Sequence, residues 1–391
     1  MTNEIKKELT DHILPFWESL RDDEFGGYYG YLDYDLKLDK KAVKGCILMS
    51  RITWFFSSAA IVLKDPSLIE YARHGFDFIR DHCIDREMGG IYWSVSHDGK
   101  AVDTTKHTYN QAFAIYALST YYDATGDMDA LTMAEDLYRT IETRMRDDHG
   151  YLEAFRRDFT PESNEKLSEN GVIATRTMNT ALHVLEAYTE FYRVTHRSDV
   201  KKDLIWILNI FADKIWNPAR LRDEVFFDAD YNSLIDLYSY GHDIETAWLV
   251  NRALDVLDEP VLTEKIAPIT KALVAEVTKE AFDGRSIPVE CEKGVVKEDR
   301  VWWVQAEAIN GYLDAYARDP SRTDYLENAR AIWNFIEEFI IDQRPGSEWF
   351  WYTDEHGVPA HDPIVEPWKC PYHNGRMCLE VISRSEKEGN L

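Results

Sequence analysis

Two histidines, His242 and His373, lie in runs of residues that could transfer protons to and from a substrate carbon. His242 and Glu245 are spaced i, i+3, so on a helix they share one face, together with Trp248. A neutral imidazole can accept a proton near neutral pH, and a carboxylate beside it can orient the ring. The alternative interpretation is a helix N-cap with a structural histidine–carboxylate pair.

His373 follows Cys370, Pro371 and Tyr372 and is predicted to open the last helix of the chain. The free backbone N–H groups and the dipole at a helix N-terminus disfavour an imidazolium, so we expect a lowered pKa and a neutral base. The alternative is a capping residue packed against the end of the chain.

Two further pairs of side chains are predicted to project from single helix faces: Trp303 with Glu307, and Asn179 with His183, each spaced i, i+4. Indole rings can stack on the C–H faces of a pyranose, and sugar hydroxyls need amide or carboxylate partners. We therefore expect Trp303 and Trp368 to be sugar-binding platforms. The alternative is that both rings belong to the hydrophobic core.

Arg51 lies inside the longest apolar run, Ile47 to Leu63, which is too short for a membrane span of roughly 20 residues and is predicted to be a buried helix. An arginine is costly to bury without a partner, so it must meet a carboxylate or an oxygen-rich ligand. We favour the ligand and keep a structural salt bridge as the alternative. Trp302, next to the predicted platform, is assigned to the core.

These side chains need helices to position them, and helical periodicity dominates the sequence. Apolar spacing and helix-breaking residues predict twelve helices, over residues 3–20, 44–63, 67–84, 107–125, 127–146, 174–195, 198–216, 242–257, 260–280, 301–318, 322–342 and 373–386. Short turns that contain Asp, Gly or Pro, such as Gly126-Asp127, join them into antiparallel pairs. Alternation over 91–95, followed by a D-G turn at 98–99, predicts a small β-hairpin between helices.

Every second predicted helix begins about 66 residues after the one before it, near residues 44, 107, 174, 242, 301 and 373. Six such helical hairpins could form an open solenoid or close into an (α/α)6 barrel with one helix of each pair inside. We predict the all-α (α/α)6 barrel, because the polar and aromatic starts of these six helices suit an inner ring whose N-termini meet at one mouth. No linker rich in Pro, Gly or Ser interrupts the chain, so residues 1–391 are predicted to form a single domain.

The composition excludes several classes of function. The 391 residues include 44 Lys and Arg against 70 Asp and Glu, a formal net charge of -26 that repels nucleic acid and anionic lipid. The amphipathic start of the chain is unlike an export signal, and five cysteines without C-x-x-C spacing predict neither disulfides nor a zinc site. The sequence contains no G-x-G-x-x-G or P-loop motif. We therefore expect a cytoplasmic protein without nucleic-acid or membrane partners.

Three runs resemble the cellobiose 2-epimerases within the wider N-acylglucosamine 2-epimerase superfamily, and the resemblance covers essentially the whole chain. They are SYGHDIE at 239–245, VWWVQAEA at 301–308 and PWKCPYHNGRM at 367–377. W-W-x-Q-A-E is shared across the superfamily, whereas G-H-D-I-E and C-P-Y-H-N-G-R-M together are characteristic of the cellobiose branch. The acylglucosamine branch usually shows Ala-Leu where this chain has Asp243-Ile244, which argues against an N-acetylmannosamine-forming enzyme.

The resemblance implies an isomerase that interconverts the reducing-end glucose of a β-1,4-linked disaccharide, such as cellobiose or lactose, with mannose, using neither a metal nor a nucleotide cofactor. It implies that His242 and His373 are the acid/base pair at C2 of the ring-opened sugar and act through a cis-enediolate. His183 would assist ring opening or the enediolate oxygens, and Arg51 would stabilise the developing oxyanion.

The resemblance also implies a sugar-binding role for further residues. Glu245 and Glu307 would orient the histidines or bind hydroxyls. The reducing-end ring would be held by Tyr109, Asn179, Trp303 and Trp368. The non-reducing sugar would meet Trp248 and the loop aromatics near Phe155 and Trp349.

Other functions fit parts of the same pattern. An inverting glycoside hydrolase needs two carboxylates about 6.5–9.5 Å apart, for which Glu245 and Glu307 are candidates, although hydrolysis has no use for two central imidazoles. A metal-dependent sugar isomerase could use His183, His242, Glu245 and His373 as ligands. A monosaccharide epimerase or isomerase of the same superfamily and a non-catalytic glycan-binding protein are further alternatives. The sequence leaves open the preferred sugar, the amount of ketose by-product and the oligomeric state, for which we expect a monomer or weak homodimer.

Overall fold

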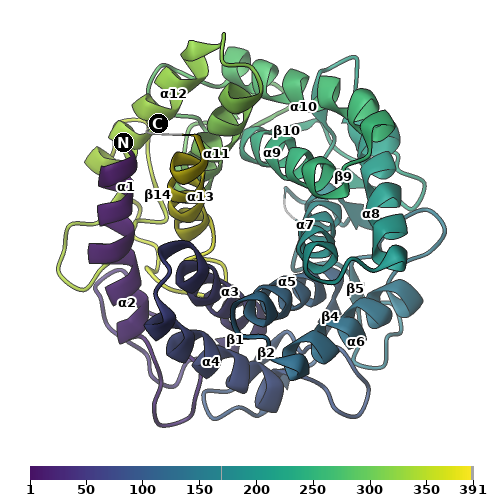
Figure 1. The fold of residues 1–391 in the computed structure, drawn as a ribbon, viewed down its shortest axis with the longest axis vertical. Coiled ribbons are helices and arrows are strands. Elements are labelled where there is room, and N and C mark those ends of the chain that lie inside the picture. Colours follow the sequence, from purple (N-terminus) through teal and green to yellow (C-terminus); the bar gives the residue numbers. More distant parts are fainter. Residues whose placement is uncertain (169, 389–391) are drawn as a thin grey trace.

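In the computed structural model, which describes residues 1–168 and 170–388, the helices form two concentric rings (Figure 1). The inner ring consists of α3 (Cys46–Leu63), α5 (Thr108–Thr125), α7 (Met178–Thr195), α9 (Tyr240–Leu257), α11 (Trp302–Arg318) and α13 (His373–Glu388). Each inner helix contacts the next inner helix along the chain, and α13 contacts α3, so the ring is closed. This confirms the predicted (α/α)6 barrel and excludes the open solenoid.

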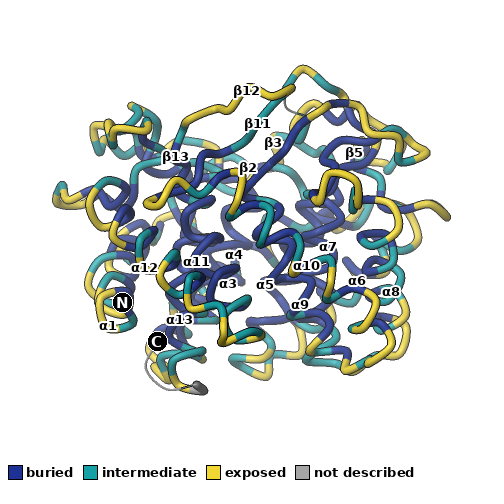
Figure 2. The backbone as a smooth tube through the Cα atoms, turned by 90° about the horizontal axis from the view of Figure 1, so that it is seen from above, coloured by how far each residue is buried: buried dark blue, intermediate teal, exposed yellow. Residues whose placement is uncertain are grey.

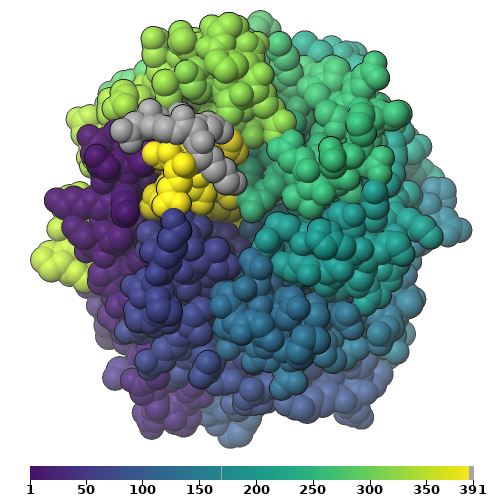
Figure 3. Space-filling view, in the orientation of Figure 1, coloured from purple at the N-terminus to yellow at the C-terminus, as the bar shows by residue number. Residues whose placement is uncertain are grey.

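The outer ring contains the remaining helices. They are α1 (Thr2–Glu8), η1 (Leu9–Ile13) and α2 (Leu14–Ser19); η2 (Pro66–Leu68), α4 (Ile69–Phe78) and η3 (Ile79–Cys83); α6 (Met128–Arg144); α8 (Ser198–Ile210) and η4 (Phe211–Ile215); α10 (Pro260–Glu280); and α12 (Thr323–Phe335) with η5 (Ile336–Ile340). The segments η1, η3, η4 and η5 are π-helical, which the periodicity did not predict. Figure 3 shows the first and last parts of the chain side by side, in agreement with the contact between α1 and α13.

Most inner helices end in a residue with left-handed backbone that turns the chain back into the outer ring. Lys64, Gly126, His196 and Asp258 follow α3, α5, α7 and α9 with φ angles of 56°, 73°, 52° and 51°. The carboxylate of Asp127 then caps α6 by accepting the backbone N–H of Asp129 at 2.9 Å. The predicted short turns therefore do join antiparallel neighbours.

At the other end of the barrel, short strands lead directly into inner helices. They are β1 (Lys44–Gly45), β4 (Lys106–His107), β6 (Arg176–Thr177), β10 (Leu237–Ser239) and β13 (Arg300–Val301). Their antiparallel partners are, in the same order, β2 (Ser94–Val95), β5 (Ala154–Phe155), β9 (Phe226–Phe227), β11 (Glu290–Glu292) and β14 (Tyr352–Thr353). In addition β3 (Ala101–Asp103) pairs with β2, β12 (Val295–Lys297) with β11, and β7 (Trp216–Asn217) with β8 (Arg222–Asp223). Figure 2 shows strands gathered beyond the helices on one side, where they fix the positions of the helix N-termini.

These strands correct three predicted helix starts. The helix predicted from residue 174 begins only at Met178, because β6 pairs with β9. Residues 44–45 belong to β1 rather than to a helix, whereas the helix predicted from 242 already begins at Tyr240. The hairpin predicted near residues 91–100 is confirmed as β2 and β3.

The hydrophobic core includes both rings. Its largest fully buried side chains include Trp17, Trp248 and Trp333. Within the described residues, α3 is the one helix long and apolar enough to cross a membrane, but 78% of it is buried inside the barrel. We therefore describe α3 as a core helix, as predicted for the run that contains Arg51.

Candidate active site

The N-terminal ends of the inner helices surround a cavity of about 290 Å³. Nine of the predicted site residues line it: Arg51, Tyr109, Asn179, His183, His242, Glu245, Trp303, Trp368 and His373. The residues come from α3, α5, α7, α9, α11, α13 and the loop before α13. The predicted convergence of these chain segments at one mouth is therefore present in the fold.

His373, the first residue of α13, is held by a carboxylate behind it. Its Nδ1 atom lies 2.7 Å from Oε1 of Glu307 and 4.0 Å from Oε1 of Glu245. Burial, followed by the nearby positive charges of Arg376 and Arg51, lowers the pKa of His373 well below its ordinary value. His373 is thus neutral, as predicted, and an Nδ1–H bonded to Glu307 leaves Nε2 free to accept a proton.

Glu307 lies behind the histidine rather than on the cavity wall. Its Oε2 atom accepts the indole N–H of Trp248 at 3.0 Å. Trp248 is 1% exposed and does not line the cavity, so the prediction that it meets the second sugar gives way to a supporting contact on Glu307.

Arg376 joins three buried carboxylates beneath the cavity. Its guanidinium donates to Glu186, to Glu245 and, at 2.7 Å, to Oε1 of Glu307. Burial and repulsion from Glu307 raise the pKa of Glu245 to about 8, because one arginine cannot neutralise three carboxylates. The free oxygen of Glu245 can therefore present a proton to a ligand hydroxyl.

His183, on α7, has a carboxylate partner of its own. Its Nδ1 atom lies 2.9 Å from Oε2 of Glu186, which also accepts the hydroxyl of Tyr372. Burial alone would raise the pKa of Glu186, but Arg376 and His183 lower it to about 2. Burial also lowers the pKa of His183 itself, against the opposing effect of Glu186.

His242 is oriented by a hydroxyl and not by Glu245, which corrects the predicted pair. Its Nδ1 atom lies 2.7 Å from Oγ of Ser239, the last residue of β10, whereas Glu245 bonds to Arg376. Burial, followed by the charge of His183, lowers the pKa of His242 to about 3. The shared helix face was predicted correctly, but the hydrogen-bond partner was not.

Trp303 lies close to both candidate acid/base residues. Its ring centroid is 4.7 Å from that of His242 and 5.5 Å from that of His373. Both imidazoles therefore border the same part of the cavity, beside one indole.

Arg51 is buried but enters no ion pair with a carboxylate in the part of the chain that the structure describes. One guanidinium nitrogen donates to the Tyr109 hydroxyl at 2.8 Å, and the group lies 4.2 Å from the ring centroid of Phe113. The salt-bridge alternative is therefore wrong, and a positive charge lines the cavity.

Several polar atoms on the cavity wall have no hydrogen-bond partner among residues 1–168 and 170–388. They are Nε of Arg51, Oδ1 of Asn179, Oε2 of Glu245 and Nε1 of Trp302. Buried polar groups are normally satisfied, so this set of donors and acceptors fits a ligand rich in hydroxyl groups. Trp302, which is 3% exposed, packs in the core as predicted and also reaches the cavity.

The rim contains residues that the sequence analysis did not single out. Lys166 and Leu167 approach from one loop, and Glu290 and Lys297, cross-strand partners in β11 and β12, approach from another. Trp351 also lines the cavity.

The loop aromatics near Phe155 and Trp349 were predicted to meet the second sugar, but Phe155 and Trp349 themselves do not line the cavity. Phe155 is 3% exposed and pairs with Lys106 in a strand. Trp349 is fully buried and donates its indole N–H to Glu8 at 2.8 Å. Both rings therefore belong to the core, whereas Trp351, a loop aromatic near Trp349, does line the cavity.

Glu245, Glu307 and His373 offer ligand atoms within 4.8 Å of one another, a donor set that a divalent ion could use. The same nitrogen of Arg376 donates to both carboxylates, so a fixed positive charge already lies against them. A cation would have to displace that charge. The short separation also argues against an inverting hydrolase, which needs its carboxylates about 6.5–9.5 Å apart.

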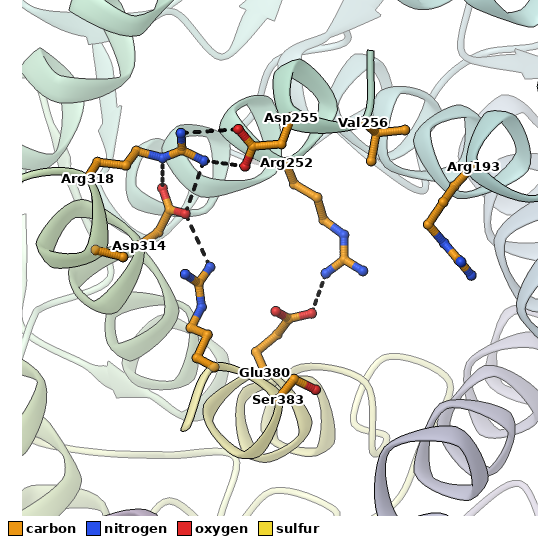
Figure 4. A pocket seen from close by; sticks show the side chains of 10 residues that line it. Arg193, Arg252, Asp255, Val256, Asp314, Arg318, Glu380 and Ser383 are labelled. Atoms are coloured by element: carbon orange, nitrogen blue, oxygen red, sulfur yellow. Dashed lines mark hydrogen bonds and ion pairs between the residues drawn. The ribbon is translucent and has the colours of Figure 1, made fainter. Parts of the chain in front are cut away.

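A second cavity, of about 510 Å³, opens among residues of α7, α9, α11 and α13 (Figure 4). Its charged side chains are already paired: Arg318 with Asp255 and Asp314, and Arg252 with Glu380. No histidine is among the described residues that line it. The chemistry therefore belongs to the histidine-lined cavity.

The chain is similar to known proteins over nearly its whole length. Residues 27–375 match the family model for N-acylglucosamine 2-epimerase (GlcNAc 2-epimerase). The chain is 52% identical to a cellobiose 2-epimerase of Eubacterium cellulosolvens, over 98% of each chain, and 48% identical to one of Ruminococcus albus, over 98% of this chain and 99% of that one. A solved structure of a sugar epimerase from a ruminal bacterium superposes with a TM-score of 0.97 at 47% identity, over 98% of this chain and 99% of that one. The chain belongs to the N-acylglucosamine 2-epimerase family.

Proposed function

We propose that the protein is a cellobiose 2-epimerase, an isomerase that interconverts glucose and mannose at the reducing end of β-1,4-linked disaccharides. The observation that carries this proposal is the placement of two neutral histidines, His242 and His373, next to the same indole, Trp303, in one cavity. Inversion at a carbon next to a carbonyl requires removal and return of one proton, and two imidazoles can do both.

The reaction begins when the sugar ring opens. The C1–O5 bond breaks, O5 gains a proton and the C1 hydroxyl loses one, which leaves an aldehyde at C1. His183, whose Nδ1–H is held by Glu186, lies on the cavity wall with Nε2 available to assist this transfer. One proton leaves the C1 hydroxyl and one proton is added to O5, so ring opening needs no net proton.

One of the two central histidines then takes the C2 proton. The electron pair of the C2–H bond forms the C1–C2 double bond of a cis-enediolate, and the negative charge moves to O1. Arg51, a positive charge without a carboxylate partner, stabilises that oxygen. The same negative charge favours the imidazolium form of the second histidine.

The second histidine takes up a proton from solvent and donates it to C2 from the opposite face after rotation about the C2–C3 bond, and ring closure gives the epimer. The first histidine then releases the C2 proton to water, so both imidazoles end neutral, as they began. The product therefore carries a solvent hydrogen at C2.

A disaccharide needs room beyond the reducing-end ring. Besides the residues of the inner helices, the cavity is lined by Lys166 and Leu167 and by Glu290 and Lys297 of β11 and β12. The relatives named above are described as cellobiose 2-epimerases. Both observations support a disaccharide rather than a monosaccharide substrate.

The test is incubation of the purified, EDTA-treated protein with cellobiose in D2O, followed by NMR. We expect 4-O-glucosyl-mannose with deuterium at C2. Free glucose would instead indicate a hydrolase, loss of activity on EDTA treatment a metal-dependent isomerase, and unchanged cellobiose would contradict the proposal.

A further inference from the structure

Arg376 lies three residues after His373 on α13, under the floor of the histidine-lined cavity. One terminal nitrogen donates to Glu186, and the other donates to Glu245 and Glu307. The side chain is 1% exposed, so these contacts lie away from solvent. A single guanidinium therefore joins carboxylates from three inner helices, α7, α9 and α11.

Two of these carboxylates each hold a histidine. Glu186 lies 2.9 Å from Nδ1 of His183, and Glu307 lies 2.7 Å from Nδ1 of His373. The chain His183–Glu186–Arg376–Glu307–His373 is thus continuous, with Arg376 as its central link. His242 is outside this chain, because its Nδ1 atom meets the Ser239 hydroxyl.

We propose, on the basis of the function above, that Arg376 is a positioning residue that couples the two histidine–carboxylate pairs, so that His183 and His373 keep their Nε2 atoms proton-free toward the substrate together. Arg376 does not line the substrate cavity, and it acts through Glu186 and Glu307. The guanidinium fork suits this position, because its several N–H donors are planar and reach carboxylates on both sides.

The sign of the electrostatic effect follows from the contacts. The positive charge of Arg376 disfavours a second positive charge on His373 or His183, whereas the negative charge of Glu186 favours it. Other charged and titratable groups that face this region are Arg51 on α3, Tyr116 on α5, Glu245 and Arg252 on α9, Glu380 on α13, and Tyr372, which directly precedes α13. All of these groups remain in place in Arg376→Met and Glu186→Gln.

The proposal concerns the pH dependence of kcat/KM for cellobiose epimerisation, which falls on the acid side as the histidines gain a proton. Two substitutions should move this acid limb in opposite directions. In Arg376→Met the limb should move to higher pH by about 1–3 units, because the histidines gain a proton more readily. In Glu186→Gln it should move to lower pH, because a neighbouring negative charge is lost. A general loss of structure would not move the limb in opposite directions.

The matched control is Arg252→Met. Arg252 is also an inner-ring arginine that is paired with a glutamate, Glu380, one helical turn after Arg376 on α13 (Figure 4). Arg252 contacts none of the three histidines of the cavity. The acid limb of Arg252→Met should therefore coincide with that of the wild-type protein. If Arg376→Met does not fold, Arg376→Lys and Glu186→Gln decide the question, since lysine keeps the charge but cannot reach carboxylates on both sides with one planar fork.

A second measurement is independent of turnover. Nitrogen-15 NMR of the histidine rings, assigned with His183→Gln and His373→Gln, reports which ring nitrogen is protonated. As the pH is lowered, we expect both rings to keep a single proton, on Nδ1, to a lower pH in the wild-type protein than in Arg376→Met, where the second ring nitrogen gains a proton earlier. If the wild-type protein shows no epimerisation, the proposed function fails while this measurement still decides the coupling. If Arg376→Met and Glu186→Gln both leave the histidine ring signals and the acid limb unchanged, the proposed role of Arg376 is overturned.

Discussion

Nδ1 of His373 lies 2.7 Å from Oε1 of Glu307, and the same oxygen accepts Arg376 at 2.7 Å. The carboxylate fixes the ring and stabilises the imidazolium that forms when His373 takes a proton. Glu307→Gln keeps the shape but loses the charge, so we expect kcat to fall about 10²- to 10⁴-fold with a smaller change in KM. Steady-state kinetics with cellobiose measure this, and an unchanged thermal midpoint controls for folding. A loss confined to KM would contradict the role given to Glu307.

His242 and His373 are predicted to act on opposite faces of C2, which makes their single variants distinguishable. In His242→Ala or His373→Ala the remaining imidazole can still remove the C2 proton from one epimer, but no group returns a proton to the other face. We expect each variant to lose epimerisation and to exchange C2 hydrogen in D2O with only one of the two epimers, glucosyl-glucose or glucosyl-mannose. Proton NMR follows both exchanges, and exchange of the same epimer by both variants would contradict the two-base scheme.

The fold was predictable because its period is regular. Helix starts recur about every 66 residues, and the turns between paired helices contain the residues that end helices. Two-residue strands such as Arg176–Thr177 were missed, because a pair of residues is too short to show alternation and its partner Phe226–Phe227 lies about 50 residues away. Because this strand was missed, the helix α7 was predicted to start too early.

The site was predictable to the extent that its residues lie at helix starts. His373 and Trp303 stand out because polar and aromatic residues begin an inner helix. The role of Arg376 was not predicted, although its spacing from His373 places it on the same helix face, because its partners come from three other helices. Trp349 was wrongly assigned for a similar reason, since its partner Glu8 is 341 residues away in the chain.

Arg51 is expected to act mainly on the transition state, because it is a positive charge without a carboxylate partner beside the cavity. Arg51→Met should lower kcat about 10²- to 10³-fold, since the enediolate oxygen loses its stabilising charge. Arg51→Lys keeps the charge and should lose less activity than Arg51→Met. Tyr109→Phe removes only the hydroxyl that Arg51 contacts and is the matched control. Equal loss in Arg51→Lys and Arg51→Met would indicate that geometry, and not charge, is what Arg51 supplies.

His107 gives a prediction on stability rather than on activity. It is fully buried at the start of α5, neither ring nitrogen has a partner within the described residues, and burial lowers its pKa to about 3. In the unfolded chain its pKa returns to about 6.5. Below that pH, His107 is therefore protonated in the unfolded state but stays neutral in the folded state. The stability contributed at neutral pH is therefore lost as the pH falls. Between about pH 7 and about pH 5 this one residue should cost about 2 kcal/mol of unfolding free energy.

The measurement is urea unfolding of the wild-type protein and His107→Gln at both pH values. Glutamine does not titrate, so the difference between the two proteins isolates the histidine from every carboxylate that titrates in the same range. We expect the free-energy difference between wild type and variant to shift by about 2 kcal/mol in favour of the variant on going to the lower pH. A difference that is independent of pH would show that His107 is protonated to the same extent in the folded and unfolded chains.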